Sequence, residues 1–483
     1  MITIRPPKYK QKKQCQLFLR KKACFFQNKN VKIHNLGNKK FNNLRNLHST
    51  ILGIVYIYSQ KRLKMENYRT RYIESQIERM LKSCSTVLVA GPKFCGKTTT
   101  CLRMAKSNIR LATRRNIELA RLEPQKTLLG EQPRLIDEWQ MVPELWDEVR
   151  AWADENPGFG QFILTGSSTP ADKTQIHHSG AGRIVTLPMR PMSLFESGDS
   201  TGSVSLADLF SNTSLSIYDT NEKHSLKDMA FYTCRGGWPL SILSDRDVAL
   251  DVTANYYNGL FNFDTSENEK FRNKKPEVLR MILRSYARNI STEAAYKTII
   301  QDITESNNRT MDTKTFDDYW DALKDLFIIS DIDAWNPNLR SKAVVRTTPT
   351  RHFVDTSIAC QALGISPDDL MGDLNSFGLF FEDLAVRDLS IYSSLLGGTV
   401  RHYRDSRGLE CDAVVHTSKG KWGAIEIKLG GEKLIEEGAA SLSKLKKDVD
   451  DPNMVFMAIV TATGPAYQRK DGIFVIPLNT LRA

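Results

Sequence analysis

The sequence lacks the cysteine spacing of a zinc protein or a disulfide-stabilised protein. Its eight cysteines are scattered, and no two of them form a Cys-x-x-Cys pair. Zinc sites and disulfide frameworks depend on recurring cysteine spacings, so neither is predicted. This cysteine usage fits a reducing compartment, and we expect the protein to be cytoplasmic.

Long hydrophobic runs are also missing. The apolar stretch at residues 51–58 is much shorter than the roughly 20 residues that a helix needs to cross a bilayer. No other run approaches that length. The sequence therefore predicts neither a membrane-spanning segment nor a membrane partner.

Acidic residues are absent from residues 1–64, which contain 16 of the 67 Lys and Arg residues of the 483-residue chain. The remainder has 51 basic and 55 acidic residues, so the net charge of +12 is no evidence that it binds DNA. Residues 1–64 are predicted to be a disordered, basic extension. Three interpretations stay open: a basic arm, a targeting peptide, or sequence upstream of the true start at Met65, which the change in composition there favours.

What the sequence does contain is a phosphate-binding pattern, Gly-Pro-Lys-Phe-Cys-Gly-Lys-Thr, at residues 91–98. An apolar, β-branched run at 86–90 precedes it and a predicted helix at 98–106 follows it, which is the context that this pattern requires. The apolar spacing of residues 72–81 predicts an amphipathic helix that leads into this run. Inward-facing N–H groups and the helix N-terminus would bind phosphates, Lys97 would contact the β- and γ-phosphates, and the Thr98 hydroxyl would hold Mg²⁺. The residues predicted to bind ATP are Gly91, Pro92, Gly96, Lys97, Thr98 and Thr99.

Two later runs predict further strands of the same sheet. The first ends in Asp137 and Glu138, which we predict to be a Mg²⁺ ligand and the general base that polarises the attacking water. The second, 161–168, ends in hydroxyl side chains and would place Thr165 near the γ-phosphate. Arg183, just before a predicted strand at 184–187, would lie near the phosphates or in a structural ion pair.

These segments resemble the prokaryotic AAA-type ATPases that carry a conserved C-terminal domain of unknown function. The matching segments are 91–99, 135–140, 164–168, 182–183, 191–196 and 236–239. The resemblance implies a P-loop AAA-type parallel sheet, with ATP and Mg²⁺ bound through Lys97, Thr98, Asp137 and Glu138. The chain departs from the family in having Lys93-Phe94 where Arg-Gln is frequent, and in lacking a clear acid after its second strand.

The middle of the chain predicts a helical lid at 206–270 and a winged-helix-like module at 271–350. The module consists of helices at 276–289, 292–300 and 315–326, followed by strands at 327–332 and 343–346, which is a common DNA-reading arrangement. Its third helix carries four aspartates and one lysine, and this net negative charge would repel the phosphate backbone of DNA. We therefore favour packing or dimerisation over DNA binding by this module, and a homo-oligomer is expected only if it dimerises.

The C-terminal residues 351–483 predict an α/β domain similar to PD-(D/E)xK nucleases. Asp412 and the Glu426-x-Lys428 pair lie on neighbouring predicted strands, and the period of two puts Glu426 and Lys428 on one face. Asp412 and Glu426 would bind Mg²⁺, Glu382 from the preceding helix would complete its ligands, and Lys428 would activate water. DNA is the partner that this arrangement implies.

The complete prediction is an ATPase domain at 65–205, the two middle modules and a nuclease-like C-terminal domain. ATP hydrolysis would switch or drive the nuclease-like domain. The alternative is a nucleotide-dependent interaction switch whose nuclease-like domain is catalytically silent.

Overall fold

The computed structural model describes residues 68–167, 180–211, 217–220, 224–261, 274–307, 310–337 and 347–483. The basic extension 1–64, Ser168 and the predicted strand 343–346 lie outside these ranges. Residues 69–483 form one compact unit. No helix within the described ranges is both long and apolar enough to cross a bilayer.

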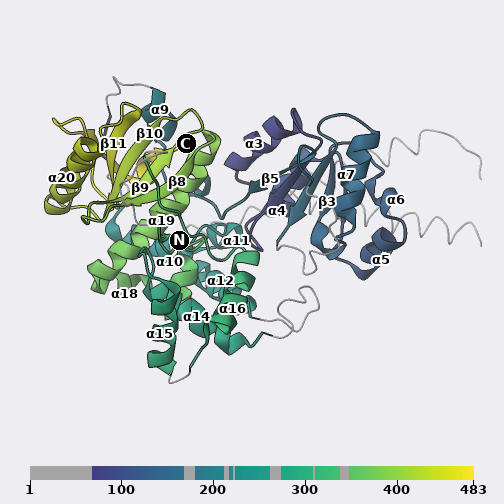
Figure 1. Cartoon of the computed structure of the whole chain (residues 1–483), viewed down its shortest axis with the longest axis horizontal. Helices are drawn as coiled ribbons and strands as arrows, with labels where there is room; N and C mark the ends of the chain where they lie inside the picture. The colour runs from purple at the N-terminus through teal and green to yellow at the C-terminus, as the bar shows by residue number, and fades with distance from the viewer. Residues whose placement is uncertain are drawn as a thin grey trace, which may run out of the picture. The chain divides into compact units, whose positions relative to one another are not determined.

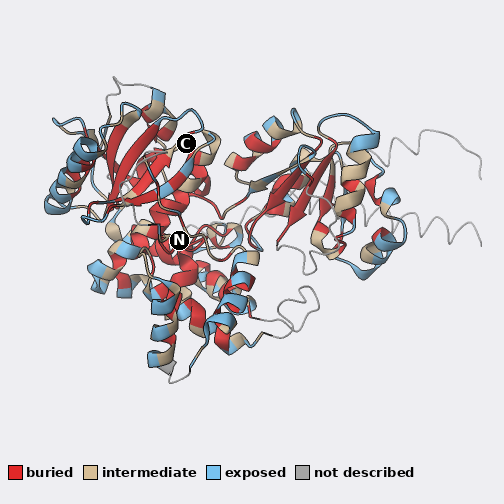
Figure 2. Ribbon diagram, in the orientation of Figure 1, coloured by how far each residue is buried: buried red, intermediate tan, exposed pale blue. Residues whose placement is uncertain are grey.

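A five-stranded parallel sheet with the order β2-β3-β4-β1-β5 forms the first part of this unit (Figure 1). Its strands are β1 (Thr86–Ala90), β2 (Ser107–Arg110), β3 (Arg134–Asp137), β4 (Phe162–Gly166) and β5 (Ile184–Pro188). Alternate residues of the central strands enter two separate hydrophobic cores, one on each face. Every residue of β1 and β4 is buried, as expected for parallel strands with helices on both sides (Figure 2).

The α-helices of this part are α3 (Tyr72–Leu81), α4 (Lys97–Met104), α5 (Arg114–Leu122), α6 (Pro124–Leu128), α7 (Leu145–Glu155) and α8 (Leu194–Ser197), with a short 3-10 helix at Trp139–Met141. The predicted bounds of α3 and β1 are confirmed to the residue. The helices α3 and α4 pack in one core of the sheet, and α5 and α7 in the other.

The middle of the chain contains two short strands that pair with C-terminal strands, followed mainly by helices. Its elements are β6 (Val204–Ser205), α9 (Leu206–Ser211), β7 (Tyr218–Asp219), α10 (Leu226–Arg235), α11 (Pro239–Ile242), α12 (Arg246–Gly259), α14 (Pro276–Arg288), α15 (Tyr296–Asn307) and α16 (Thr313–Asp325). Strand β6 pairs with β14 (Leu481–Arg482), and β7 pairs with β12 (Ala466–Gln468). The beginning of the predicted lid is therefore associated with the C-terminal sheet: Phe210 of α9 contacts Phe456, and β7 pairs with β12. The other described helices of the lid begin at α10.

The three helices predicted for residues 271–350 are present and share an aromatic core. Trp320 lies within about 5 Å of the rings of Tyr286, Tyr296 and Phe316 and is almost fully buried. After α16 the described residues form three isolated bridges, Ile329–Phe353, Ile332–Thr350 and Ala334–His402. The predicted strand at 327–332 is therefore not a regular strand, its predicted partner at 343–346 lies outside the described residues, and the winged helix is not confirmed.

The C-terminal part contains a seven-stranded mixed sheet with the order β7-β12-β13-β11-β10-β9-β8. Its remaining strands are β8 (Thr399–Arg404), β9 (Glu410–His416), β10 (Trp422–Lys428), β11 (Met454–Thr461) and β13 (Phe474–Pro477). The helices are α17 (Ser357–Leu363), α18 (Pro367–Gly372), α19 (Leu374–Leu395) and α20 (Glu432–Val449), with a 3-10 helix at Leu478–Thr480. Helix α19 shares a core with Ile425 and Ile427, whereas α20 shares one with Trp422 and Ala424, so the two helices cover opposite faces of the sheet.

Candidate nucleotide site

The carboxyl ends of three neighbouring strands bring three polar side chains into one row. In the sheet register Arg110 of β2 lies opposite Asp137 of β3, which lies opposite Thr165 of β4. The phosphate-binding loop, residues 91–98, follows β1 at the same edge, because β1 runs parallel to β4. The loop and the predicted acid therefore meet despite the 38 residues that separate Thr98 from Asp137 in sequence.

The backbone of the phosphate-binding loop depends on its glycines. Gly96 has a φ of +105°, a left-handed conformation that few residues other than glycine adopt. A Cβ on Gly91 would lie 2.1 Å from the carbonyl oxygen of Met189, so that position excludes any side chain. Lys97 is buried, and its Nζ donates to the carbonyl oxygens of Gly91 (2.8 Å) and Pro92 (2.7 Å). A cationic group thus lies within a loop that can accommodate anions.

Asp137 connects this loop to the strand ends. Its Oδ1 accepts hydrogen bonds from Thr98 Oγ1 (2.7 Å) and Thr165 Oγ1 (2.6 Å), and its Oδ2 pairs with Arg110 Nε at 3.0 Å. The carboxylate is fully buried. The hydroxyl of Thr98 beside the carboxylate of Asp137 provides the oxygen ligands that Mg²⁺ prefers, so the donor set fits the predicted ion.

Glu138 has an unusual backbone conformation for a glutamate, with φ 62° and ψ 48°. Such left-handed residues carry strain and are concentrated at functional sites. Its Oε2 accepts hydrogen bonds from Gln140 Nε2 (2.5 Å) and Ser167 Oγ (3.0 Å), and its N–H donates to Thr165 Oγ1. The side chain is thereby held at the strand edge that carries Asp137.

The structure does not bring Arg183 to this group. Arg183 precedes β5, whose first residue pairs with Thr86 at the amino end of β1, the opposite end of the sheet from the loop. Its Nε pairs with Asp154 Oδ1 at 2.8 Å, as the structural alternative expected. Thr99 lies on the first turn of α4 with its side chain exposed. Sequence reasoning missed Arg110, which stands at the end of the second strand, where the resembling family usually shows an acid.

Replacing Gly91 with alanine is expected to weaken nucleotide binding about tenfold or more, because the added methyl group would displace the loop from Met189. The measurement is titration with a fluorescent ATP analogue, with circular dichroism to verify folding. Gly372→Ala is the matched control, since a Cβ there meets nothing within 4 Å. An unchanged affinity in Gly91→Ala would contradict the loop's assigned role.

The four side chains predicted for the C-terminal site also come close together. Lys428 Nζ lies 3.0 Å from Asp412 Oδ2 and 2.7 Å from Glu426 Oε2. Ser441 of α20 donates to Glu426 Oε1 at 3.0 Å. Burial and then the nearby Asp412 carboxylate raise the pKa of Glu382 well above its usual range. Burial, followed by Asp412, raises the pKa of Glu426 to about 8, while Lys428 opposes this shift.

The predicted Mg²⁺ site at these residues is not confirmed. Across the described ranges, no three or more His, Cys, Asp or Glu side chains are placed to hold a metal ion. Glu426 accepts a hydrogen bond from Ser441 of α20, whereas Glu382 comes from α19, whose core lies on the other face of the sheet. The ammonium group of Lys428 lies between Asp412 and Glu426. We derive no metal-dependent step at this site.

The raised pKa of Glu426 makes folding stability depend on pH. Between its ordinary pKa of 4.5 and about 8, the folded state holds a proton that the unfolded state releases. We therefore expect the midpoint of urea unfolding to fall as pH rises from about 5 to 8. Glu426→Gln should reduce this decline, whereas Glu437→Gln on the exposed side of α20 should not. A decline of equal size in Glu426→Gln and wild type would contradict the assignment.

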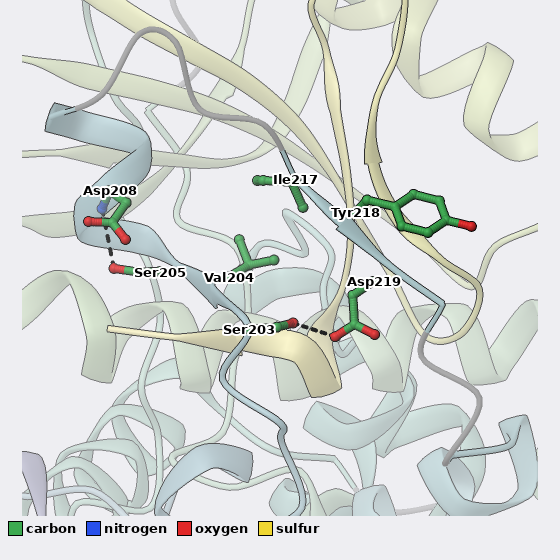
Figure 3. A pocket seen from close by; sticks show the side chains of 7 residues that line it. All are labelled: Ser203, Val204, Ser205, Asp208, Ile217, Tyr218 and Asp219. Carbon is green, nitrogen blue, oxygen red and sulfur yellow. Dashed lines mark hydrogen bonds between the residues drawn. The ribbon is translucent and has the colours of Figure 1, made fainter.

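A separate hollow of about 130 Å³ lies beside β6 and β7 (Figure 3). Its lining residues are Ser203, Val204, Ser205, Asp208, Ile217, Tyr218 and Asp219. Ser203 donates a hydrogen bond to Asp219 across one side of it. None of the lining residues belongs to the loop or to the strand ends around Asp137, so this hollow is not part of the candidate nucleotide site.

Comparison with protein families supports the assignment of the first domain. Residues 84–197 match a family described as an AAA domain. Residues 226–369 and 377–481 match two families described as domains of unknown function (DUF8612 and DUF4143). A search of curated proteins gives no match. Residues 84–197 are thus an AAA domain, a module that implies nucleotide binding, and two further domains follow it.

Proposed function

We propose that this protein binds ATP with Mg²⁺, hydrolyses it, and uses the nucleotide state to switch its C-terminal half. The observation that carries the proposal is the contact between Thr98 of the loop and the buried Asp137. Lys97 would neutralise charge on the β- and γ-phosphates, and the loop N–H groups would orient them. Mg²⁺, bound through Thr98 and Asp137, would supply further positive charge.

Glu138 is the residue that we propose as general base. Its carboxylate is held by Gln140 and Ser167 beside the strand end that carries Asp137. A carboxylate so placed can accept the proton of a water that attacks the γ-phosphate. Release of phosphate from ATP by the full chain, with and without Mg²⁺, tests the proposal, and no release by the wild-type protein would overturn it.

A second candidate function, a nuclease, is favoured by the convergence of Asp412, Glu426 and Lys428. The ion pairs of Lys428 and the position of Glu382 favour the alternative, an interaction switch with a silent nuclease-like domain. Incubation of wild type and Glu426→Ala with plasmid DNA, Mg²⁺ and ATP distinguishes the two. We expect equally intact DNA in both samples. Cleavage by the wild type alone would establish the nuclease.

A further inference from the structure

Two of the segments that resemble the ATPase family, 191–196 and 236–239, have no role in the nucleotide site described above. They contact each other, since Met192 N donates to the carbonyl oxygen of Gly237 at 2.7 Å. A Cβ on Gly237 would lie 2.1 Å from the Met192 carbonyl oxygen, so only glycine allows this approach. Both segments belong to a set of buried polar contacts that begins at the phosphate-binding loop.

The first member of this set is Arg71, just before α3. Its Nη1 donates to the carbonyl oxygen of Cys95 inside the loop, and its Nη2 donates to the carbonyl oxygen of Arg190 after β5, both at 2.8 Å. Only 3% of the Arg71 side chain is exposed. One guanidinium group therefore fixes the loop relative to the chain after β5.

Glu196 of α8 is the counterion of Arg71. Its Oε1 lies 3.1 Å from Arg71 Nε and accepts from Tyr72 N, while its Oε2 accepts from Ser193 N as part of a capping box. The pair is buried, and all of these contacts are hydrogen bonds. The energy of a buried, fully hydrogen-bonded ion pair depends strongly on its geometry. Displacement of the loop would therefore disturb the contact between Arg71 and Glu196 of α8.

From α8 the contacts continue into the C-terminal half. The first N–H of α8, Leu194 N, donates to Asp388 Oδ2 on α19 at 2.9 Å. Arg387 Nη2 donates to Asp388 Oδ1 at 2.7 Å, and Arg387 Nη1 donates to Asp355 Oδ2 at 2.9 Å. Asp355 Oδ2 also accepts a hydrogen bond from Gly237 N at 2.8 Å, so these contacts lead back to the segment 236–239.

A direct contact runs beside this set, from Gln76 Nε2 on α3 to Ser394 Oγ on α19 at 2.9 Å. A hollow of about 40 Å³ lies along the same contact and is bordered by Arg71, Glu196 and Ser394, among others. The junction between the ATPase domain and α19 therefore combines buried polar contacts with a shared apolar core and contains a small unfilled volume.

Helix α19 joins this junction to the C-terminal cluster. It is continuous over 22 residues. Asp388 faces the junction, and Glu382, less than two turns earlier, responds electrostatically to Asp412 and Lys428. A shift of the helix at Asp388 would therefore move Glu382 as well.

We propose that Arg71 is a positioning residue for the phosphate-binding loop, and that the contacts through Glu196, α8 and Asp388 couple the loop's nucleotide state to α19. This proposal deepens the proposed function and rests on it. Coupling of this kind is reciprocal, so changes at Asp388 would also affect nucleotide affinity. The coupled output is the position of α19, whether or not the C-terminal domain carries out chemistry.

The test compares hydrogen exchange of peptides that cover α19 in the full chain, with and without Mg²⁺ and ADP. The variants are Arg71→Lys, Asp388→Asn and Ser394→Ala, and the control is Arg114→Gln, which removes an exposed ion pair on α5. ADP affinity is measured for each protein with a fluorescent analogue. Ser394→Ala is included because it removes one hydroxyl at a partly exposed position and leaves the buried charges paired.

In wild type and Arg114→Gln, we expect ADP to slow exchange in α19. In Asp388→Asn and, more weakly, in Ser394→Ala, this response should diminish although ADP still binds. Arg71→Lys keeps the positive charge but cannot reproduce the two guanidinium hydrogen bonds to the carbonyl oxygens of Cys95 and Arg190. It should therefore lower ADP affinity about 5- to 100-fold. Failure of wild type to bind ADP would overturn the proposed function itself. Binding without any change in α19, or an unchanged response in folded Asp388→Asn and Ser394→Ala, would overturn the coupling alone.

Discussion

Replacement of Glu138 by glutamine is expected to lower kcat for ATP hydrolysis by about 100- to 10,000-fold, which is the range that a general base contributes. Glutamine can keep the contact with Gln140 or Ser167 but cannot accept the proton of the attacking water. Because Glu138 is not one of the residues predicted to contact the phosphates, the affinity for ATP should change little. The measurement is steady-state phosphate release together with equilibrium binding.

Glu155→Gln is the matched control, since Glu155 is an exposed glutamate at the end of α7. It should hydrolyse ATP at the wild-type rate. If Glu138→Gln retained more than about a tenth of wild-type kcat, a general-base role worth two or more orders of magnitude would be excluded.

Replacement of Lys97 by alanine is expected to weaken ATP binding by about 10- to 100-fold, because one charge-assisted hydrogen bond to phosphate is lost. The rate of ATP hydrolysis should fall by a larger factor than ATP affinity if the ammonium group also stabilises the charge that develops on the γ-phosphate in the transition state. The contacts of Nζ with the carbonyl oxygens of Gly91 and Pro92 would be lost too. Thermal unfolding should therefore be measured beside the titration.

Lys93→Ala provides the comparison, since Lys93 is a lysine of the same loop whose side chain is exposed. Its affinity for ATP should stay within a few-fold of wild type. Equal losses in the two variants would indicate a general charge effect and not a contact specific to Lys97.

Around the candidate nucleotide site, the sequence predicted local structure correctly where simple patterns determine position. The run at 86–90 is uniformly apolar, and the helix at 72–81 has clear apolar spacing, so both were predicted with correct bounds. The meeting of Thr98 and Asp137 followed from the rule that parallel strands end at one edge. Arg183 precedes its strand, and the same rule explains why it lies at the far edge.

The remaining features depend on tertiary information that local patterns do not carry. Strand β2 is short and half exposed, so Arg110 could be placed beside Asp137 only through the sheet register. Arg71 and Glu196 are charged residues that a periodic pattern assigns to the surface, yet they form a buried pair 125 residues apart. The position of Glu382 depends on which face of the sheet α19 covers, and the strand period alone does not determine that.

We propose above that Thr98 and Asp137 bind the Mg²⁺ of a nucleotide held by the phosphate-binding loop. The most direct test of this proposal is calorimetric titration of the full chain with ATP, with and without Mg²⁺, for wild type and Asp137→Asn. We expect Mg²⁺ to strengthen ATP binding to wild type about tenfold or more, and Asp137→Asn to lose most of this gain. ATP binding that is absent in wild type, or a Mg²⁺ effect of equal size in both proteins, would contradict the proposal.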